Sequence, residues 1–201
     1  MEDKLYNLGL VCGRFGHIHN GHINLLKHSL TLCNKTLILV GSCQESGTLR
    51  NPFSADLRIN LIKTVYSNDA DKIIIGTLED MTNEYDITYD WGNFVKTRVE
   101  ECAGRFADLI VNGDDKLREG WFSPKDLEKT SRLVVARNNM PISATKIRTL
   151  LATHEKLEWE KYTPKEIHPL YDMIRNKLLS VPVYKQIYDE ACKKRTYSIQ
   201  L

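Results

Sequence analysis

A chain of 201 residues, with 42% hydrophobic and 27% charged residues, is long enough for one compact domain, or for one domain with a modest appendage. Its 28 lysines and arginines nearly balance 26 acidic residues, which gives a net charge of +2. This balance excludes a broad electrostatic field for nucleic acid or a membrane surface, so any anion site must be local.

The cysteines are odd in number and scattered, and they include no C-x-x-C pair. They are Cys12, Cys33, Cys43, Cys102 and Cys192. This pattern predicts thiols in a reducing compartment, without a disulfide framework or a zinc site. The start of the chain lacks the features of a signal peptide, and no apolar run approaches the roughly 20 residues that span a bilayer. We therefore expect a cytoplasmic protein with no membrane partner.

Five short apolar runs have the length and β-branched content of buried strands. They lie at residues 8–12, 36–41, 72–76, 108–112 and 132–136. The runs at 37–40 and 73–75 show no alternation of apolar and polar residues, which is typical of strands covered on both faces of a parallel sheet.

Segments with helical spacing of apolar residues separate these strands. Ile23, Leu26 and Leu30 follow the first strand, residues 55–66 carry the second helical pattern, and the third begins near Trp91. Alternating strands and helices predict an α/β fold, a Rossmann-like doubly wound parallel sheet of five strands.

No strand is expected after the fifth. A short helix capped by Ser143 runs to about residue 151, and two more helices are expected at 164–179 and 184–194. We therefore divide the chain into an α/β domain of residues 1–150 and a helical C-terminal extension of residues 151–201 packed on it. The extension also leaves open that copies of the chain assemble into a homo-oligomer.

The first candidate motif, residues 13–22, joins the first strand to the first helix. Such a junction presents unpaired backbone N–H groups and the positive end of the helix dipole, which bind anions. His19 and His22 are three residues apart and lie on one side of the helix start. Gly21 lets a phosphate approach the backbone, and Arg14 adds charge.

Other interpretations of this motif stay open at this point. Two histidines at helical spacing are often surface residues or caps. A zinc site of His17, His19 and His22 lacks a suitably placed fourth ligand nearby. Neither a Walker P-loop nor a G-x-G-x-x-G pattern is present.

The second candidate motif is Ile142-Ser143-Ala144-Thr145-Lys146-Ile147-Arg148, after the fifth strand. It gathers backbone N–H groups, two hydroxyls and two cations at another helix N-terminus. An ordinary capped helix with solvated charges is the competing interpretation.

Together, Gly13-Arg14-Phe15, His19-Asn20-Gly21-His22 and the second motif resemble the signatures H-x-G-H and I-S-x-T-x-[IV]-R of the nucleotidylyltransferase superfamily. His17 stands where a proline is usual. The resemblance implies that His19, His22 and Arg148 are catalytic and that the second motif holds the β- and γ-phosphates of ATP. The implied ATP-binding residues are Gly13, Arg14, Phe15, Gly21, Gly113, Asp114, Ile142, Ser143, Thr145 and Lys146.

Residues 41–54 resemble the G-S-A-Q-x-S-x-T-x-x-N-P-F-[ST] stretch of nicotinamide-mononucleotide adenylyltransferases of the archaeal-type and related bacterial branch. The implied acceptor-binding residues are Ser42, Gln44, Arg50, Asn51, Arg58, Asp80 and Trp91. Trp91 is implied to stack on the pyridine ring, although it also suits the apolar face of its own helix.

The resemblance implies transfer of AMP from ATP to nicotinamide mononucleotide, with Mg²⁺ held by the triphosphate and water instead of a protein cage. Nicotinic acid mononucleotide or another phosphorylated acceptor, such as phosphopantetheine, remains an alternative, as does a nucleotide sensor without turnover. Class I aminoacyl-tRNA synthetases share the H-x-G-H idea, but this chain is short and lacks a basic RNA-binding surface, so no nucleic-acid partner is expected.

Overall fold

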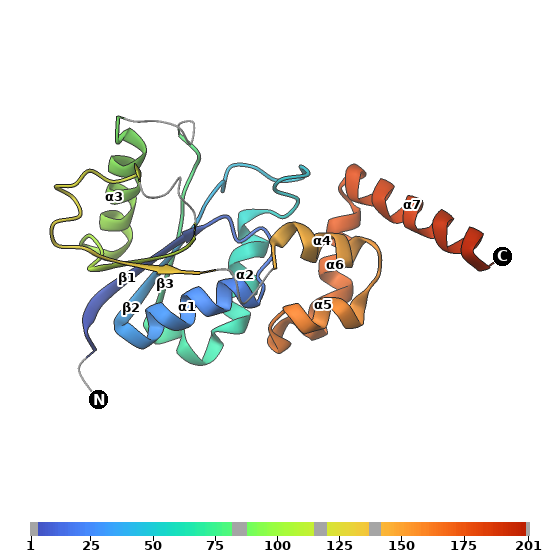
Figure 1. The fold of residues 1–201 in the computed structure, drawn as a ribbon, viewed down its shortest axis with the longest axis horizontal. Helices are drawn as coiled ribbons and strands as arrows, with labels where there is room; N and C mark the ends of the chain where they lie inside the picture. Colours follow the sequence, from blue (N-terminus) through green and yellow to red (C-terminus); the bar gives the residue numbers. More distant parts are fainter. Residues whose placement is uncertain (1–3, 82–87, 115–119, 137–141, 200–201) are drawn as a thin grey trace.

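A five-stranded parallel sheet forms the centre of the computed structural model, which describes residues 4–81, 88–114, 120–136 and 142–199 (Figure 1). The strands are β1 (Tyr6–Gly13), β2 (Cys33–Val40), β3 (Ile73–Thr77), β4 (Leu109–Gly113) and β5 (Ser131–Val135). Their order is β3-β2-β1-β4-β5, and all four neighbouring pairs are parallel. The order reverses beside β1, which is where ligands bind in open α/β sheets.

Helices cover both faces of the sheet. Helices α1 (Asn20–Leu32) and α2 (Ala55–Val65) lie on one face, and α3 (Asp90–Ala103) lies on the other (Figure 1). Within β2, Ile38 belongs to the apolar cluster on the first face and Leu37 to the cluster on the second. Both are fully buried, which explains why this strand shows no alternation and confirms the expected doubly wound sheet.

The C-terminal region is helical but differs in detail from the prediction. Its helices are α4 (Ala144–Ala152), α5 (Lys156–Tyr162), α6 (Tyr171–Leu179) and α7 (Pro182–Ile199). The single helix expected at 164–179 is instead a 3₁₀ segment, Lys165–Leu170, followed by α6. Pro169 explains the change, because it lacks a backbone N–H and disfavours the α conformation in the residue before it. Helix α5 and the 3₁₀ segment Ser67–Lys72 were not expected.

The C-terminal helices share the core of the sheet domain. Trp159 and Tyr171 are buried in the same apolar cluster as Val11 and Leu26, which come from β1 and α1. The expected boundary at residue 150 falls inside α4. Helix α7 runs outward from this helical group toward the C-terminus (Figure 1).

Among the described residues, no helix combines the length and the apolar character that crossing a membrane requires.

Candidate functional site

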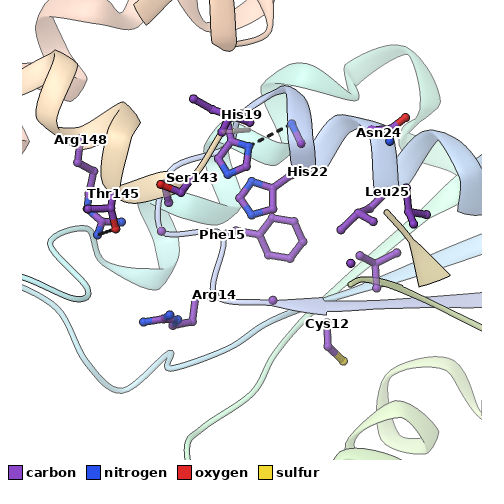
Figure 2. A pocket seen from close by; sticks show the side chains of 18 of the residues that line it. Cys12, Arg14, Phe15, His19, His22, Asn24, Leu25, Ser143, Thr145 and Arg148 are labelled. Atoms are coloured by element: carbon purple, nitrogen blue, oxygen red, sulfur yellow. Dashed lines mark hydrogen bonds between the residues drawn. The ribbon is translucent and has the colours of Figure 1, made fainter. Parts of the chain in front are cut away.

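A cleft of about 660 Å³ opens where β1 and β4 end and where α1 and α4 begin (Figure 2). Its lining carries three arginines and two histidines: Arg14, Arg50, Arg148, His19 and His22. No aspartate or glutamate is present among the described residues that line it. A concave site with several cations and no carboxylate favours a multiply charged anion.

The turn from β1 to α1 fixes His19 at the helix start. His19 is the N-cap of α1, and its Nδ1 accepts a hydrogen bond from the backbone N–H of Gly21 at 3.1 Å. A nitrogen that accepts this bond carries no proton of its own, so the proton of the neutral ring lies on Nε2. The cap thus fixes the neutral His19 ring as the tautomer that carries its proton on Nε2.

Three rings stack beside this cap. The centroids of His19 and His22 lie 3.9 Å apart, and those of His22 and Phe15 lie 4.7 Å apart. Phe15 is buried and has a left-handed backbone with φ of 48°, which turns its ring under His22 (Figure 2). A Cβ at position 21 would lie 2.8 Å from Cε1 of His19, so glycine at this position leaves room for the His19 ring. The pair is therefore held in place by packing before a ligand arrives.

His17 belongs to the core and not to the cleft. It is fully buried, Nδ1 lies 2.7 Å from the carbonyl oxygen of Ile18, and Nε2 accepts the indole N–H of Trp159 at 3.3 Å. Both ring nitrogens are occupied in the neutral form, with the proton on Nδ1. Burial lowers the pKa of His17 from 6.5 to about 3, with smaller contributions from His19 and Arg148. The residue that replaces the usual proline therefore ties the first motif to α5.

This burial predicts an acid-sensitive fold. The unfolded chain protonates His17 below pH 6.5, whereas the folded chain keeps it neutral down to about pH 3. Stability is therefore complete above pH 6.5 and falls as the pH drops through this window, by about 2 kcal/mol between pH 7.5 and pH 5. His17→Gln, which keeps an acceptor for Trp159, should reduce the difference between urea-unfolding free energies at these two pH values by that amount. Equal pH dependence in both proteins would show that folding does not lower the pKa of His17.

The start of α4 forms the opposite wall of the cleft. The Ser143 hydroxyl caps the helix by accepting the backbone N–H of Lys146 at 3.2 Å. Arg148, 6% exposed, donates from Nη2 to the Thr145 hydroxyl at 3.3 Å and lines the cleft. Ile142, Ser143 and Thr145 also line it. Lys146 does not, and its ammonium lies 4.4 Å from the ring centroid of Tyr162.

The structure places Arg58 away from the expected phosphate contact. Its guanidinium is buried and donates to the carbonyl oxygens of Arg14 and Gly41 at 2.7 Å, Ser42 at 3.0 Å and Ser54 at 3.3 Å. Burial lowers its pKa. These bonds hold together the turns after β1 and β2, so Arg58 shapes the cleft and does not line it.

The other residues expected to bind the acceptor also lie mostly outside the cleft. Arg50 lines it, whereas Ser42, Gln44, Asn51 and Asp80 do not. Ser42 is buried with a φ of 49°, and Gln44 Oε1 accepts the Asp80 backbone N–H at 3.3 Å. Asn51 is buried and donates from Nδ2 to the carboxylate of Glu45.

Trp91 is partly buried and packs against the second apolar cluster. Its ring centroid lies 5.7 Å from that of Trp121, edge to face, and 5.9 Å from that of Phe94. It does not line the cleft, and its expected stacking on the pyridine ring stays a prediction. Gly113, at the end of β4, lines the cleft, but the exposed Asp114 beside it does not.

Several residues that line the cleft were not predicted from the sequence to be part of the site. Gly16 lies against Arg148. A Cβ at Gly16 would be only 3.1 Å from Nη1 of Arg148. Asn24 and Leu49 also line the cleft. Gly16 lies inside the first motif, but nothing in the sequence links it to a residue 132 positions later.

Within the described ranges, no three histidine, cysteine, aspartate or glutamate side chains are grouped so that they could hold a metal ion. The polar groups of the cleft are imidazoles, guanidiniums, hydroxyls and amides, which suit an anion better than a bare divalent cation.

Solved structures share this fold. A bifunctional NMN adenylyltransferase/ADP ribose pyrophosphatase from Francisella tularensis superposes with a TM-score of 0.67 at 20% identity. The match covers 97% of this chain but only 56% of that one. A nicotinic acid mononucleotide adenylyltransferase from Plasmodium falciparum has a TM-score of 0.54 at 16% identity, over 90% of this chain and 98% of its own.

Relatives named nicotinamide-nucleotide adenylyltransferase align along most of the chain. The protein from Saccharolobus solfataricus is 29% identical over 165 residues, which cover 80% of this chain and 87% of the relative. One from Sulfolobus acidocaldarius is 26% identical over 182 residues, or 89% and 96% of the two chains. The family model described as cytidylyltransferase-like matches residues 10–150. The chain therefore belongs to the cytidylyltransferase-like family, within the nucleotidylyltransferase superfamily.

Proposed function

We propose that this chain is a nicotinamide-nucleotide adenylyltransferase that transfers AMP from ATP to nicotinamide mononucleotide, forming NAD and pyrophosphate. The observation that carries this proposal is the cleft between the N-termini of α1 and α4, whose described lining contains cations and no carboxylate. Two helix starts that face one cleft suit a triphosphate held at both ends. The relatives' names support the choice of acceptor.

In this proposal the two ends of the cleft act on different phosphates. The Nε2–H of His19 and the ring of His22 stabilise charge on the α-phosphate while an oxygen of the acceptor phosphate attacks phosphorus in line. Arg148 and the N–H groups at the start of α4 hold the leaving pyrophosphate. No covalent enzyme intermediate is needed, because orientation and charge stabilisation suffice for direct displacement.

ATP enters as its magnesium complex. The ion travels with the substrate, bound to triphosphate oxygens and water, which agrees with the absence of acidic side chains from the described lining of the cleft. It contributes charge neutralisation on the triphosphate, whereas the protein contributes the positions of its own donors.

A direct assay tests both the reaction and the acceptor. The protein is incubated with ATP, Mg²⁺ and either nicotinamide or nicotinic acid mononucleotide, and pyrophosphate release is measured. We expect release with both substrates present and the higher kcat/KM with nicotinamide mononucleotide. A preference for the nicotinic acid form would change the acceptor. No release with either, despite ATP binding, would favour another phosphorylated acceptor or a nucleotide sensor.

A further inference from the structure

The first turn of α7 reaches the candidate site through one hydroxyl group. Nε of Arg148 donates to the Tyr184 hydroxyl oxygen at 2.6 Å, and that hydroxyl donates to the carbonyl oxygen of Leu49 at 2.9 Å. Tyr184 is 2% exposed. We propose that Tyr184 is a positioning residue that orients Arg148 for the leaving pyrophosphate and fixes the Leu49–Arg50 wall of the cleft, so that α7 is part of the active site.

The chemistry of the contact explains why a tyrosine suits this position. A phenol hydroxyl is both a donor and an acceptor, so it satisfies the Arg148 guanidinium and the Leu49 carbonyl together. No carboxylate pairs with Arg148 in the part of the chain that the structure describes, so its charge remains available to an anion. Without Tyr184, the Nε–H of Arg148 would lose its partner in a buried setting, and the Leu49 carbonyl would lose a partner in a partly buried one.

Two buried arginines near the cleft, Arg58 and Arg148, differ in what their guanidinium groups can bind. Arg58 makes four bonds to carbonyl oxygens and does not line the cleft. Arg148 donates to the two hydroxyls of Tyr184 and Thr145 and does line it. Anchoring Nε and one Nη in this way fixes the plane of the guanidinium, which sets how its other donors meet phosphate oxygens.

Tyr184 also joins two walls of the cleft that are far apart in the sequence. Leu49 and Arg50 come from the loop after β2, whereas Arg148 comes from α4, and all three line the cleft. One hydroxyl bridges the two segments from a third element. Its loss is expected to loosen both cationic walls at once, although the ring would stay in its apolar cluster.

The test is Tyr184→Phe, which removes the hydroxyl and keeps the ring. Its matched control is Tyr188→Phe, one turn further along α7, where the ring lies near Arg175 and Lys185 and outside the cleft. Because the inference rests on the proposed function, we expect kcat for NAD formation to fall about 10–100-fold in Tyr184→Phe. The control should stay within twofold of the parent, and thermal unfolding of both variants should remain close to it.

A double-mutant cycle separates positioning from general stability. If Tyr184 acts in part through Arg148, Tyr184→Phe should lower kcat by a smaller factor in an Arg148→Ala background, where only its effect on the Leu49–Arg50 wall remains. The same fold-loss in both backgrounds, or near-parental kinetics of Tyr184→Phe, would overturn the proposal. A cooperative loss of folding in Tyr184→Phe alone would likewise count against it.

Calorimetric binding of pyrophosphate without acceptor distinguishes this inference from the proposed function. Tyr184→Phe should weaken pyrophosphate binding, whereas Tyr188→Phe should not, even if neither mononucleotide is a substrate. In that case the proposed acceptor is wrong but the positioning role stands. Turnover with normal pyrophosphate affinity in Tyr184→Phe gives the opposite result, in which the function stands and the role of Tyr184 does not.

Discussion

His22→Ala is expected to lower kcat for NAD formation by about 10²–10³-fold while the protein stays folded, because it removes one preorganised donor from the developing charge. The ring of His22 lies between those of Phe15 and His19 at the start of α1 and faces the cleft. His22 is only partly buried, so truncation should affect chemistry more than folding.

Steady-state kinetics with varied ATP and varied nicotinamide mononucleotide measure this effect, and circular dichroism checks the fold. A fall in kcat with little change in either KM would place the interaction in the transition state. His28→Ala is the matched control, since His28 is exposed on the same helix. Turnover of His22→Ala within a few-fold of the parent would remove His22 from the mechanism and leave His19 as the histidine that acts on the α-phosphate.

The sheet and the two motifs could be predicted because their signals are local. Each strand overlaps a short apolar run in the sequence. Each motif combines a helix start with residues that are only a few positions apart. The two motifs were expected to act together, and the structure does bring them to one cleft. Parallel strands make this possible, since their carboxyl ends meet at one edge of the sheet.

The roles of side chains were mispredicted or missed where their bonding partners lie far away in the sequence. Arg58 has the charge of a phosphate ligand, but carbonyl groups from two other turns occupy it. His17 bonds to Trp159 across 142 positions, and Arg148 bonds to Tyr184 across 36. A single sequence shows charge and spacing, but it does not show which long-range bonds have already been made.

These long-range bonds also suggest why the C-terminal helices accompany this site. Trp159 holds His17, Tyr184 holds Arg148, and Nδ2 of Asn20 donates to the Lys161 carbonyl oxygen at 3.2 Å. Each bond joins one of the two phosphate-facing motifs to α5 or α7. The C-terminal helices thus hold residues around the cleft in place, and they also extend the apolar core.

Arg148→Met should have an effect as large as that of His22→Ala, but on a different phosphate. Methionine fills part of the space and removes the charge, so the leaving pyrophosphate loses its buried cation. We expect kcat for NAD formation to fall by about 10²–10³-fold. In the reverse reaction, from NAD and pyrophosphate to ATP, KM for pyrophosphate should rise while KM for NAD changes little, because NAD contains no β- or γ-phosphate from ATP.

Arg105→Met provides the control, since Arg105 is exposed and pairs only with the nearby Asp108 among the described ion pairs. Such surface pairs contribute roughly 0–1 kcal/mol, so this variant should retain parental kinetics. If Arg148→Met raised KM for NAD and pyrophosphate equally, Arg148 would support the cleft as a whole and not the leaving group. A selective rise for pyrophosphate would instead place the leaving group at the start of α4, opposite the histidines, as in-line transfer between the two helix termini requires.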